Sequence, residues 1–333
     1  MSLDRMRLGG SLAAAVTFSV VLAGCGSAPA PSGAPAAAPA ADGAAVRVVA
    51  STNVYGSIVS AIGGDRVAVT SIIDSPDADP HEYESTPADA AAVNEAQLVV
   101  VNGGGYDGFA TKLVDAAAAK PTVIDVVELS GLEPAPAAAP EPAEAGTDEH
   151  GHEHGEFNEH VWYSLPTVEK LADRLAADLA ATDPAGAATY TGNATSFKGQ
   201  VDGLIAKLDA IKTAHGGDKV AITEPVPLYT VQDAGLENLT PEEFSEAVEE
   251  GNDPPVAVLN ETLQLFTAKT VKALLANAQT ESPSTTQVEQ AATAAGIPVV
   301  PVTETLPAGV DDYIAWQTGQ IDQLSSALGT PAS

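Results

Sequence analysis

The chain has 333 residues and an acidic composition, with 45 acidic against 14 basic side chains and a formal net charge of −31. Its apolar fraction of 45% is enough for a sizeable core, or for two lobes of ordinary domain size. The charge argues against nucleic acid and against an anionic membrane surface as partners. The single cysteine excludes an intrachain disulfide and a thiolate cluster, so any bound metal would need nitrogen and oxygen ligands.

Residues 1–24 have the pattern of a secretory signal segment. Arg5 and Arg7 precede a mostly apolar run that is too short for a stable membrane span. The run ends in L-A-G-C, which resembles a bacterial lipobox, so we expect Cys25 to be the lipidated first residue of the mature chain. Residues 25–45 are rich in Ala, Pro, Gly and Ser and predict a flexible tether. We therefore expect a protein outside the cytoplasm, held at the bacterial cell membrane by its lipid anchor.

Residues 46–183 predict an N-terminal lobe in which short apolar strands alternate with helices. This alternation is typical of a parallel sheet covered by helices on both faces. The predicted strands are Val46–Ala50, Val67–Ile73, Leu98–Val101 and Thr122–Val127. The predicted helices are Asn53–Ile62, Pro87–Ala96, Phe109–Ala118 and Leu165–Ala180.

Residues 135–159 interrupt this lobe with Ala, Pro, Glu, Gly and His and show no apolar face. Short histidine-rich tracts have a metal-binding composition, so we expect His150, His152 and His154 to form an accessory metal-binding loop. His160 differs from these three because Val161, Trp162 and Tyr163 follow it directly and predict that it is anchored against a core.

Residues 184–214 predict one long helix between the two halves of the chain. Asp183 and Pro184 have the residue types of an N-cap and a first-turn proline. Apolar residues then recur at helical spacing to about Ala214, which corresponds to a helix about 45 Å long. We interpret this helix as a rigid link between lobes.

Residues 215–333 repeat the alternation and predict a C-terminal lobe. The predicted strands are Lys219–Thr223, Val256–Leu259 and Ile297–Val302. The predicted helices are Leu228–Ala234, Thr262–Ala276, Thr285–Ala295 and Val310–Leu328, with an acidic capped segment at Leu239–Asp253. The predicted fold is therefore α/β, with two Rossmann-like lobes, each a mainly parallel sheet flanked by helices, joined by one long rigid helix.

Four candidate metal ligands follow the predicted strands of the two lobes. Ligands bind at the carboxyl ends of strands in open parallel sheets, and this rule selects His81, His160, Glu224 and Glu304. Two neutral imidazoles and two carboxylates would balance the charge of a dication. Each residue alone has a more ordinary interpretation, as a structural histidine or a solvated glutamate, so the prediction depends on the joint pattern. The alternatives for the fourth ligand are Glu261, Glu281 and Asp233, whereas His215 fits the turn after the long helix.

Several motifs occur in an order that resembles a known family. They are D-P-H-E-Y-E at 79–84, the acidic histidine-rich insertion, N-E-H-V-W-Y at 158–163 and D-P-A-G-A-A-T-Y-T-G-N-A at 183–194. Together with the lipobox they resemble the zinc/manganese substrate-binding lipoproteins of ABC importers, the cluster A-I or ZnuA-like group. The resemblance implies a metal held between two lobes and delivered to an ABC permease driven by its ATPase.

The resemblance also carries a ligand set over to this chain. The first two histidine ligands of the family correspond to His81 and His160. The third is histidine or glutamate in the family and corresponds to Glu224. The fourth is usually aspartate, whereas this chain has Glu304 at that place.

The choice of metal depends on opposing features of the ligand set. Carboxylates favour a hard ion such as manganese, whereas the histidine-rich loop and the general affinity order favour zinc. We expect zinc first and manganese second, in a monomeric binding protein that is not an enzyme. The alternatives are a lipid-anchored zinc-dependent hydrolase, which would lack the usual H-E-x-x-H spacing, and an adhesin-type surface protein.

Overall fold

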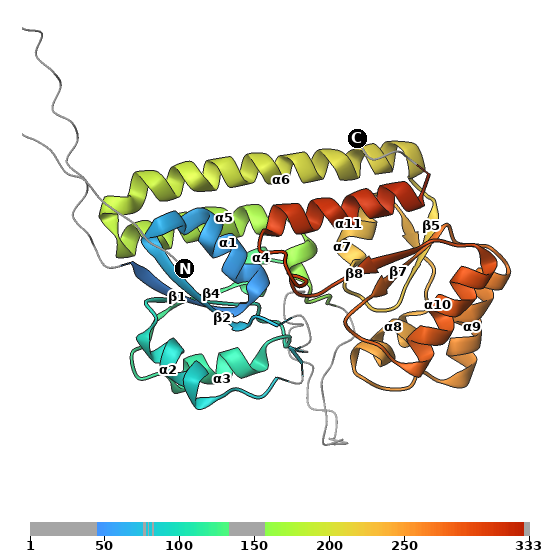
Figure 1. The fold of residues 1–333 in the computed structure, drawn as a ribbon, viewed down its shortest axis with the longest axis horizontal. Coiled ribbons are helices and arrows are strands. Elements are labelled where there is room, and N and C mark those ends of the chain that lie inside the picture. The colour runs from blue at the N-terminus through green and yellow to red at the C-terminus, as the bar shows by residue number, and fades with distance from the viewer. Residues whose placement is uncertain (1–44, 76–77, 79, 82, 133–156, 330–333) are drawn as a thin grey trace, which may run out of the picture. The chain divides into compact units, whose positions relative to one another are not determined.

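The computed structural model describes residues 45–75, 78, 80–81, 83–132 and 157–329. Within them lie two four-stranded sheets in which every pairing is parallel. The strand orders are β2-β1-β3-β4 in the N-terminal lobe and β6-β5-β7-β8 in the C-terminal lobe, so both sheets have the same arrangement. The predicted fold of two parallel α/β lobes is confirmed (Figure 1).

The N-terminal sheet is built from strands β1 (Val46–Thr52), β2 (Val67–Ile73), β3 (Leu98–Val101) and β4 (Thr122–Asp125). All four residues of β3 are buried, as expected for a strand covered on both faces. The helices between the strands are α1 (Asn53–Gly63), α2 (Pro87–Glu95), α3 (Gly108–Ala116) and the short α4 (Val126–Ser130). Helix α2 begins where its sequence predicts, because Thr86 and Asp89 form a capping box around Pro87.

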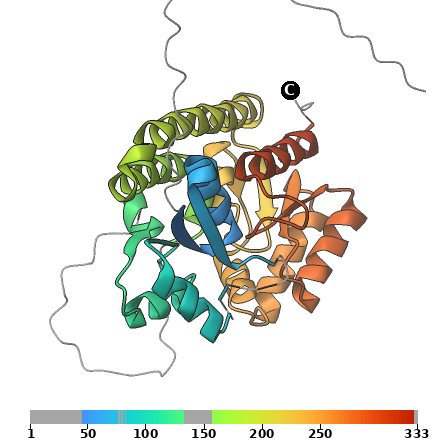
Figure 2. The ribbon, with the colours of Figure 1, turned by 60° about the vertical axis from the view of Figure 1, so that its left-hand side comes forward.

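Two long helices, α5 (Leu165–Thr182) and α6 (Ala187–His215), follow the N-terminal sheet. The 29 residues of α6 span about 44 Å, and Figures 1 and 2 show this helix crossing both lobes. Its start corrects the sequence prediction, since Asp183 precedes a separate 3₁₀ turn, Pro184–Gly186, and its side chain forms no capping hydrogen bond to that turn or to α6. The Asp183 carboxylate instead accepts hydrogen bonds from Arg66 Nε (2.7 Å) and from the Tyr190 hydroxyl (2.8 Å).

The C-terminal sheet is built from strands β5 (Lys219–Ile222), β6 (Glu237–Asn238), β7 (Ala273–Asn277) and β8 (Val299–Val302). Its helices are α7 (Leu228–Asp233), α8 (Glu242–Glu249), α9 (Val256–Thr267), α10 (Pro283–Ala295) and α11 (Tyr313–Ala327).

Two of the sequence predictions for this lobe are wrong. The predicted strand Val256–Leu259 is the first turn of α9, and part of the predicted helix Thr262–Ala276 is the strand β7. Alanine and leucine in β7 favour a helix by propensity. All five residues of β7 are nevertheless buried between β5 and β8, so burial in a parallel sheet decides their conformation.

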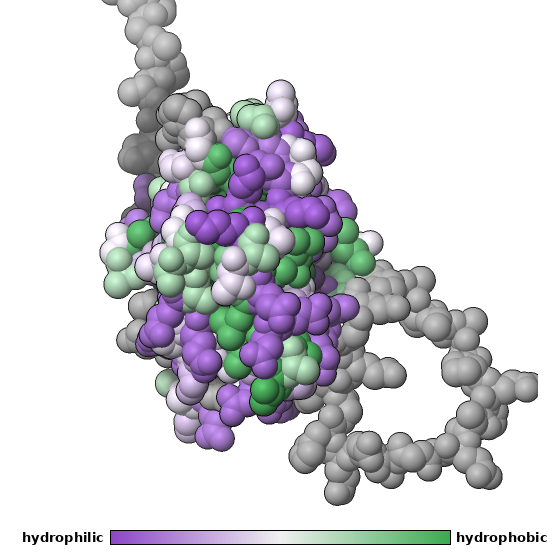
Figure 3. All heavy atoms as spheres, turned by 90° about the vertical axis from the view of Figure 1, so that its right-hand side faces the viewer, coloured by the Kyte–Doolittle hydropathy of each residue, from purple (hydrophilic) through white to green (hydrophobic). Residues whose placement is uncertain are grey.

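The hydrophobic core has one large part that is common to both lobes. It runs from β1 through α1, α5, α6 and α11 to β8. Each sheet also has a smaller core on its other face. This core lies under α2 and α3 in the N-terminal lobe and under α8, α9 and α10 in the C-terminal lobe. The described residues accordingly form one compact unit. On the face shown in Figure 3, hydrophobic side chains are interspersed with hydrophilic ones.

Several predicted segments lie outside the described residues, namely the signal segment, the tether with Cys25 and most of the histidine-rich insertion with His150, His152 and His154. Among the described residues, no helix combines the length and the apolar character needed to cross a bilayer.

Candidate metal centre

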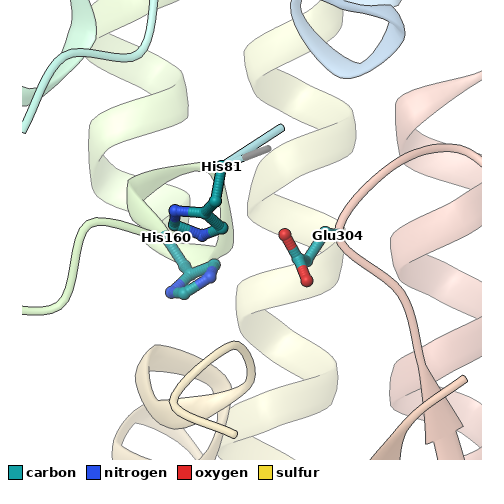
Figure 4. A group of neighbouring side chains, drawn as sticks. All are labelled: His81, His160 and Glu304. Atoms are coloured by element: carbon teal, nitrogen blue, oxygen red, sulfur yellow. The ribbon is translucent and has the colours of Figure 1, made fainter. Parts of the chain in front are cut away.

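The carboxyl ends of both sheets present polar side chains to one another. His81 lies in the loop after β2, Glu224 and Glu304 follow β5 and β8, and Asn277 is the last residue of β7. His160 directly precedes a buried 3₁₀ turn, Val161–Tyr163. Potential ligand atoms of His81, His160 and Glu304 all lie within 4.8 Å of one another. Figure 4 shows the two imidazole rings beside each other, with the Glu304 carboxylate opposite them.

The orientation of His160 is fixed by its neighbour Asn158. The Asn158 amide donates through Nδ2 to the carbonyl of Pro225 (3.1 Å), which turns its oxygen toward the imidazole. That oxygen lies 2.7 Å from His160 Nδ1, so we assign the ring proton to Nδ1. Burial, and then the nearby His81, hold the pKa of His160 well below its usual value. The ring is therefore neutral and has its lone pair on Nε2, as a metal-binding imidazole requires.

Aromatic rings surround the two imidazoles. Tyr106 meets both histidines edge-on, with ring centroids 5.1 Å from His81 and 5.8 Å from His160. The indole of Trp162 lies 5.1 Å from His160 and 4.5 Å from Tyr106, again between ring centroids. The His160 side chain is 1% exposed and that of His81 is 27% exposed. His81 is thus the histidine that solvent can reach.

Glu304 and Glu224 are held together by one amide group. Asn277 Nδ2 donates to Glu224 Oε2 (2.5 Å) and to Glu304 Oε1 (2.7 Å). The Tyr106 hydroxyl of the other lobe donates to Glu304 Oε2 (3.3 Å). Burial raises the pKa of Tyr106 well above its usual value, so this hydroxyl keeps its proton. Glu224 therefore lies beside the group formed by His81, His160 and Glu304 without being part of it.

Two further carboxyl groups approach the histidines, one from each lobe. Glu159 Oε1 lies 3.5 Å from His81 Nε2, and Glu249 Oε1, at the end of α8, lies 3.3 Å from His160 Nε2. Burial, followed by repulsion from Glu304 and Asp107, raises the pKa of Glu159 to about 8. Burial, followed by repulsion from Glu159, Glu304 and Glu224, raises the pKa of Glu249 to about 9. This concentration of carboxyl groups favours a cation over an anion.

The other sequence candidates lie away from this centre. Glu261, Glu281 and Asp233 are exposed, and none of them belongs to a group of potential ligands among the described residues. His215 pairs with Asp218 (3.0 Å) in the turn after α6, as its sequence position predicts.

Sequence reasoning missed the residues that orient or adjoin the histidines, chiefly Asn158, Tyr106, Asn277 and Glu249. Asn158 and Glu159 could have been found, because they flank His160 in the motif N-E-H-V-W-Y. Glu249 carries no such signal, since it is one of several glutamates on an acidic helix. Only the packing of the C-terminal lobe against residues 157–163 brings it near His160.

The geometry defines a class of protein, namely a two-lobed α/β protein with imidazoles and carboxylates between the lobes. Residues 48–327 match the family model described as "ZnuA: Zinc-uptake complex component A periplasmic". The chain belongs to this family, and the resemblance drawn from its motifs is confirmed.

Two curated relatives are named for manganese. The chain is 31% identical over 182 residues to the manganese-binding lipoprotein MntA of Halalkalibacterium halodurans, covering 55% of this chain and 52% of that one. It is 28% identical over 174 residues to the manganese ABC transporter substrate-binding lipoprotein PsaA of Streptococcus pneumoniae serotype 4. That match covers 49% of this chain and 50% of PsaA. The chain thus spans about half the length of the curated relatives it matches.

A crystal structure of ZnuA has the same fold. It superimposes with a TM-score of 0.67 at 21% identity, covering 86% of this chain and all of that one.

Proposed function

We propose that this protein binds one divalent transition-metal ion between its lobes, as the substrate-binding component of an ABC importer. The observation that carries the proposal is the convergence of His81, His160 and Glu304, whose ligand atoms lie within 4.8 Å of one another although three separate segments supply them. We call these three residues the inner group. Neutral imidazole and carboxylate are the ligand types that such ions prefer.

Glu224 is the ligand that we propose in addition to the inner group. It shares the Asn277 amide with Glu304, so a rearrangement of that amide would turn a second carboxylate toward the ion. Two carboxylates and two neutral imidazoles would then balance the charge of the dication, which limits the cost of burying it. The proposed role is binding rather than catalysis, in accordance with the family of transporter components to which the chain belongs.

Zinc is the ion we propose first, with manganese second. For a given set of nitrogen and oxygen ligands, zinc binds more tightly than manganese. Two features support manganese as the second candidate: the carboxylates around the site would suit a higher coordination number, and two relatives are named for that ion.

Delivery and location complete the proposal. The family description names zinc uptake, and the named relatives are lipoproteins, so we propose that Cys25 anchors the chain outside the cytoplasm and that it passes its ion to a membrane permease with an ATPase. We propose that His150, His152 and His154 bind metal weakly, as an accessory to the inner group.

Calorimetric titration of the metal-free protein with zinc and then manganese tests the proposal. We expect one tight site, tighter for zinc. His160→Ala and Glu224→Ala should abolish tight binding, whereas His215→Ala and Glu261→Ala, matched controls remote from the centre, should leave it unchanged. The absence of a tight site for either ion in the wild-type protein would contradict the proposed function.

A further inference from the structure

A second group of potential ligands adjoins the inner group and has one member in common with it. Ligand atoms of His81, Glu159 and Glu249 also lie within 4.8 Å of one another. We call these three residues the outer group. Because His81 belongs to both groups, they offer neighbouring positions to one ion.

The two groups differ in their access to solvent. His81, 27% exposed at its side chain, is common to both groups, so the difference comes from the other members. In the outer group, the side chains of Glu249 and Glu159 are 20% and 8% exposed. In the inner group, the His160 side chain is 1% exposed and Glu304 is 7% exposed. An ion that arrives from solvent therefore meets the outer group first.

An independent observation at His160 indicates a cation between the two groups. His160 Nε2 is fully buried and forms no hydrogen bond, although Glu249 Oε1 lies only 3.3 Å away. Because the ring proton is on Nδ1, this nitrogen presents a lone pair toward the Glu249 carboxyl group. A divalent ion can take the place of the carboxyl proton there and be bound by both groups.

The backbone around Glu249 adds to this preference. Glu249 is the last residue of α8, where the free carbonyl groups of the helix carry partial negative charge. Glu246, one turn earlier, and Glu250, the next residue, add their own carboxylates to the same end of the helix. Glu159 approaches from the opposite lobe, so an ion in the outer group would contact both lobes.

We propose that His81, Glu159 and Glu249 form an outer cation position, which takes up the divalent ion from solvent and passes it to His160 and Glu304 while His81 remains bound. This inference rests on the proposed function, since it describes the route to the same site. The transfer is an exchange of ligands around one ion: the oxygen atoms of Glu159 and Glu249 leave as His160 Nε2 and Glu304 bind.

A variant that disables the inner group should leave the ion in the outer position. Glu304→Gln keeps the size of the side chain and its capacity to accept a hydrogen bond from Asn277, but it removes an anionic ligand. We expect this variant to retain weakened Mn²⁺ binding. The added Glu249→Gln substitution should lower the remaining affinity at least about tenfold, since it removes one ligand. The added Glu250→Gln substitution, which removes the same charge from the neighbouring residue, should change it less than about twofold.

Anomalous diffraction from crystals of Glu304→Gln with Mn²⁺ gives the position directly. We expect a peak within coordination distance of the Glu159 and Glu249 carboxylates. A peak elsewhere, or equal residual affinities in the two double variants, would overturn the outer position. Wild-type protein titrated in parallel separates the two proposals. If it binds neither zinc nor manganese tightly, the proposed function fails; if it binds tightly while Glu249→Gln has no effect in the Glu304→Gln background, only the outer position fails.

Discussion

Single side chains around His160 determine whether it can bind a metal. Asn158 holds the proton on Nδ1 and is itself held by the carbonyl of Pro225 in the other lobe. Such partners set the tautomer and the orientation of a metal-binding imidazole. A residue that never touches the ion thereby prepares the ligand for it.

Asn158→Ala tests this role. We expect the affinity for zinc to fall about 10- to 100-fold, because the imidazole loses the acceptor that fixes its ring. Asn260→Ala is a suitable control, since Asn260 is exposed on α9 and donates only to a carbonyl of its own helix. Titration of both variants with zinc measures the effect, and equal affinities would show that Asn158 does not orient His160.

Glu159 and Glu249 make the stability of the metal-free protein depend on pH. Their pKa values, about 8 and about 9 in the folded state, lie above the ordinary value of 4.5. Between the ordinary pKa and the raised ones, the folded protein therefore binds more protons than the unfolded chain. As a result, the free energy of unfolding decreases as pH rises from about 5 to 9. We expect Glu249→Gln to reduce this decrease and Glu250→Gln to leave it in place, as measured by thermal unfolding in a chelator. If the stability of wild-type protein and of Glu249→Gln changed with pH to the same extent, Glu249 would not be a source of the pH dependence.

The sequence predicts only those residues of the centre that follow a strand or belong to a recognisable motif. His81, His160 and Glu304 each follow a recognisable pattern, and the structure brings them together, while their role as ligands stays a prediction. Glu249 could not be predicted, because its place depends on how α8 packs against a segment about ninety residues earlier in the chain.

At the scale of elements, the junction between α5 and α6 depends on one glycine. A Cβ atom on Gly186 would come within 2.6 Å of atoms of Arg66, Asp183 and Tyr190, the residues that form the hydrogen-bonded cluster at this turn. The absence of a side chain at Gly186 thus lets these three residues pack closely against the turn.

Two glycine substitutions should therefore have opposite effects on stability. Gly186→Ala should lower the free energy of unfolding by about 1–3 kcal/mol through overpacking. Gly192→Ala, in the exposed interior of α6 with open space around it, should raise it by about 0.5–1 kcal/mol. Urea denaturation measures both, and a neutral Gly186→Ala would show that the turn can relax.

Strands and helices could be predicted where local pattern and burial agree. The boundaries of β2 and β3 were predicted to the residue, because β3 is an apolar run that ends at Asn-Gly-Gly-Gly and β2 is a run rich in β-branched residues that ends at Asp-Ser-Pro. The errors at α9 and β7 arise where local pattern and burial disagree. A valine-rich segment forms the exposed start of a helix, and an alanine- and leucine-rich segment forms a central strand. Only tertiary packing distinguishes these cases.

At the scale of the molecule, the two sheets share one core, although the sequence has the form of two separate α/β lobes. The side chains that join them come from α5, α6 and α11 and form part of both lobes. Hydrogen bonds reinforce the connection, for example from the amide of Asn53 to the carbonyl of Leu306 (3.2 Å) and from the Leu306 N–H back to Asn53 (2.9 Å).

We expect the two lobes to unfold together for this reason. Calorimetry of the metal-free protein should give a single transition whose calorimetric and van't Hoff enthalpies agree. Circular dichroism at 222 nm should follow the same curve. Two resolved transitions would show that each lobe has a core sufficient for its own stability.

Helix α11 has a consequence for how the protein is made. Its first residue, Tyr313, donates its hydroxyl hydrogen to the carbonyl of Trp162 (2.7 Å), and its backbone N–H binds Ser57 Oγ (2.9 Å). The turn that supports His160 is therefore completed by a segment synthesised about 150 residues later. A ribosome that stops before α11 releases a chain whose N-terminal lobe, although fully translated, lacks part of its own cover. Such a fragment would be an early target for proteolysis, so quality control at the end of the chain also protects its metal-binding segment.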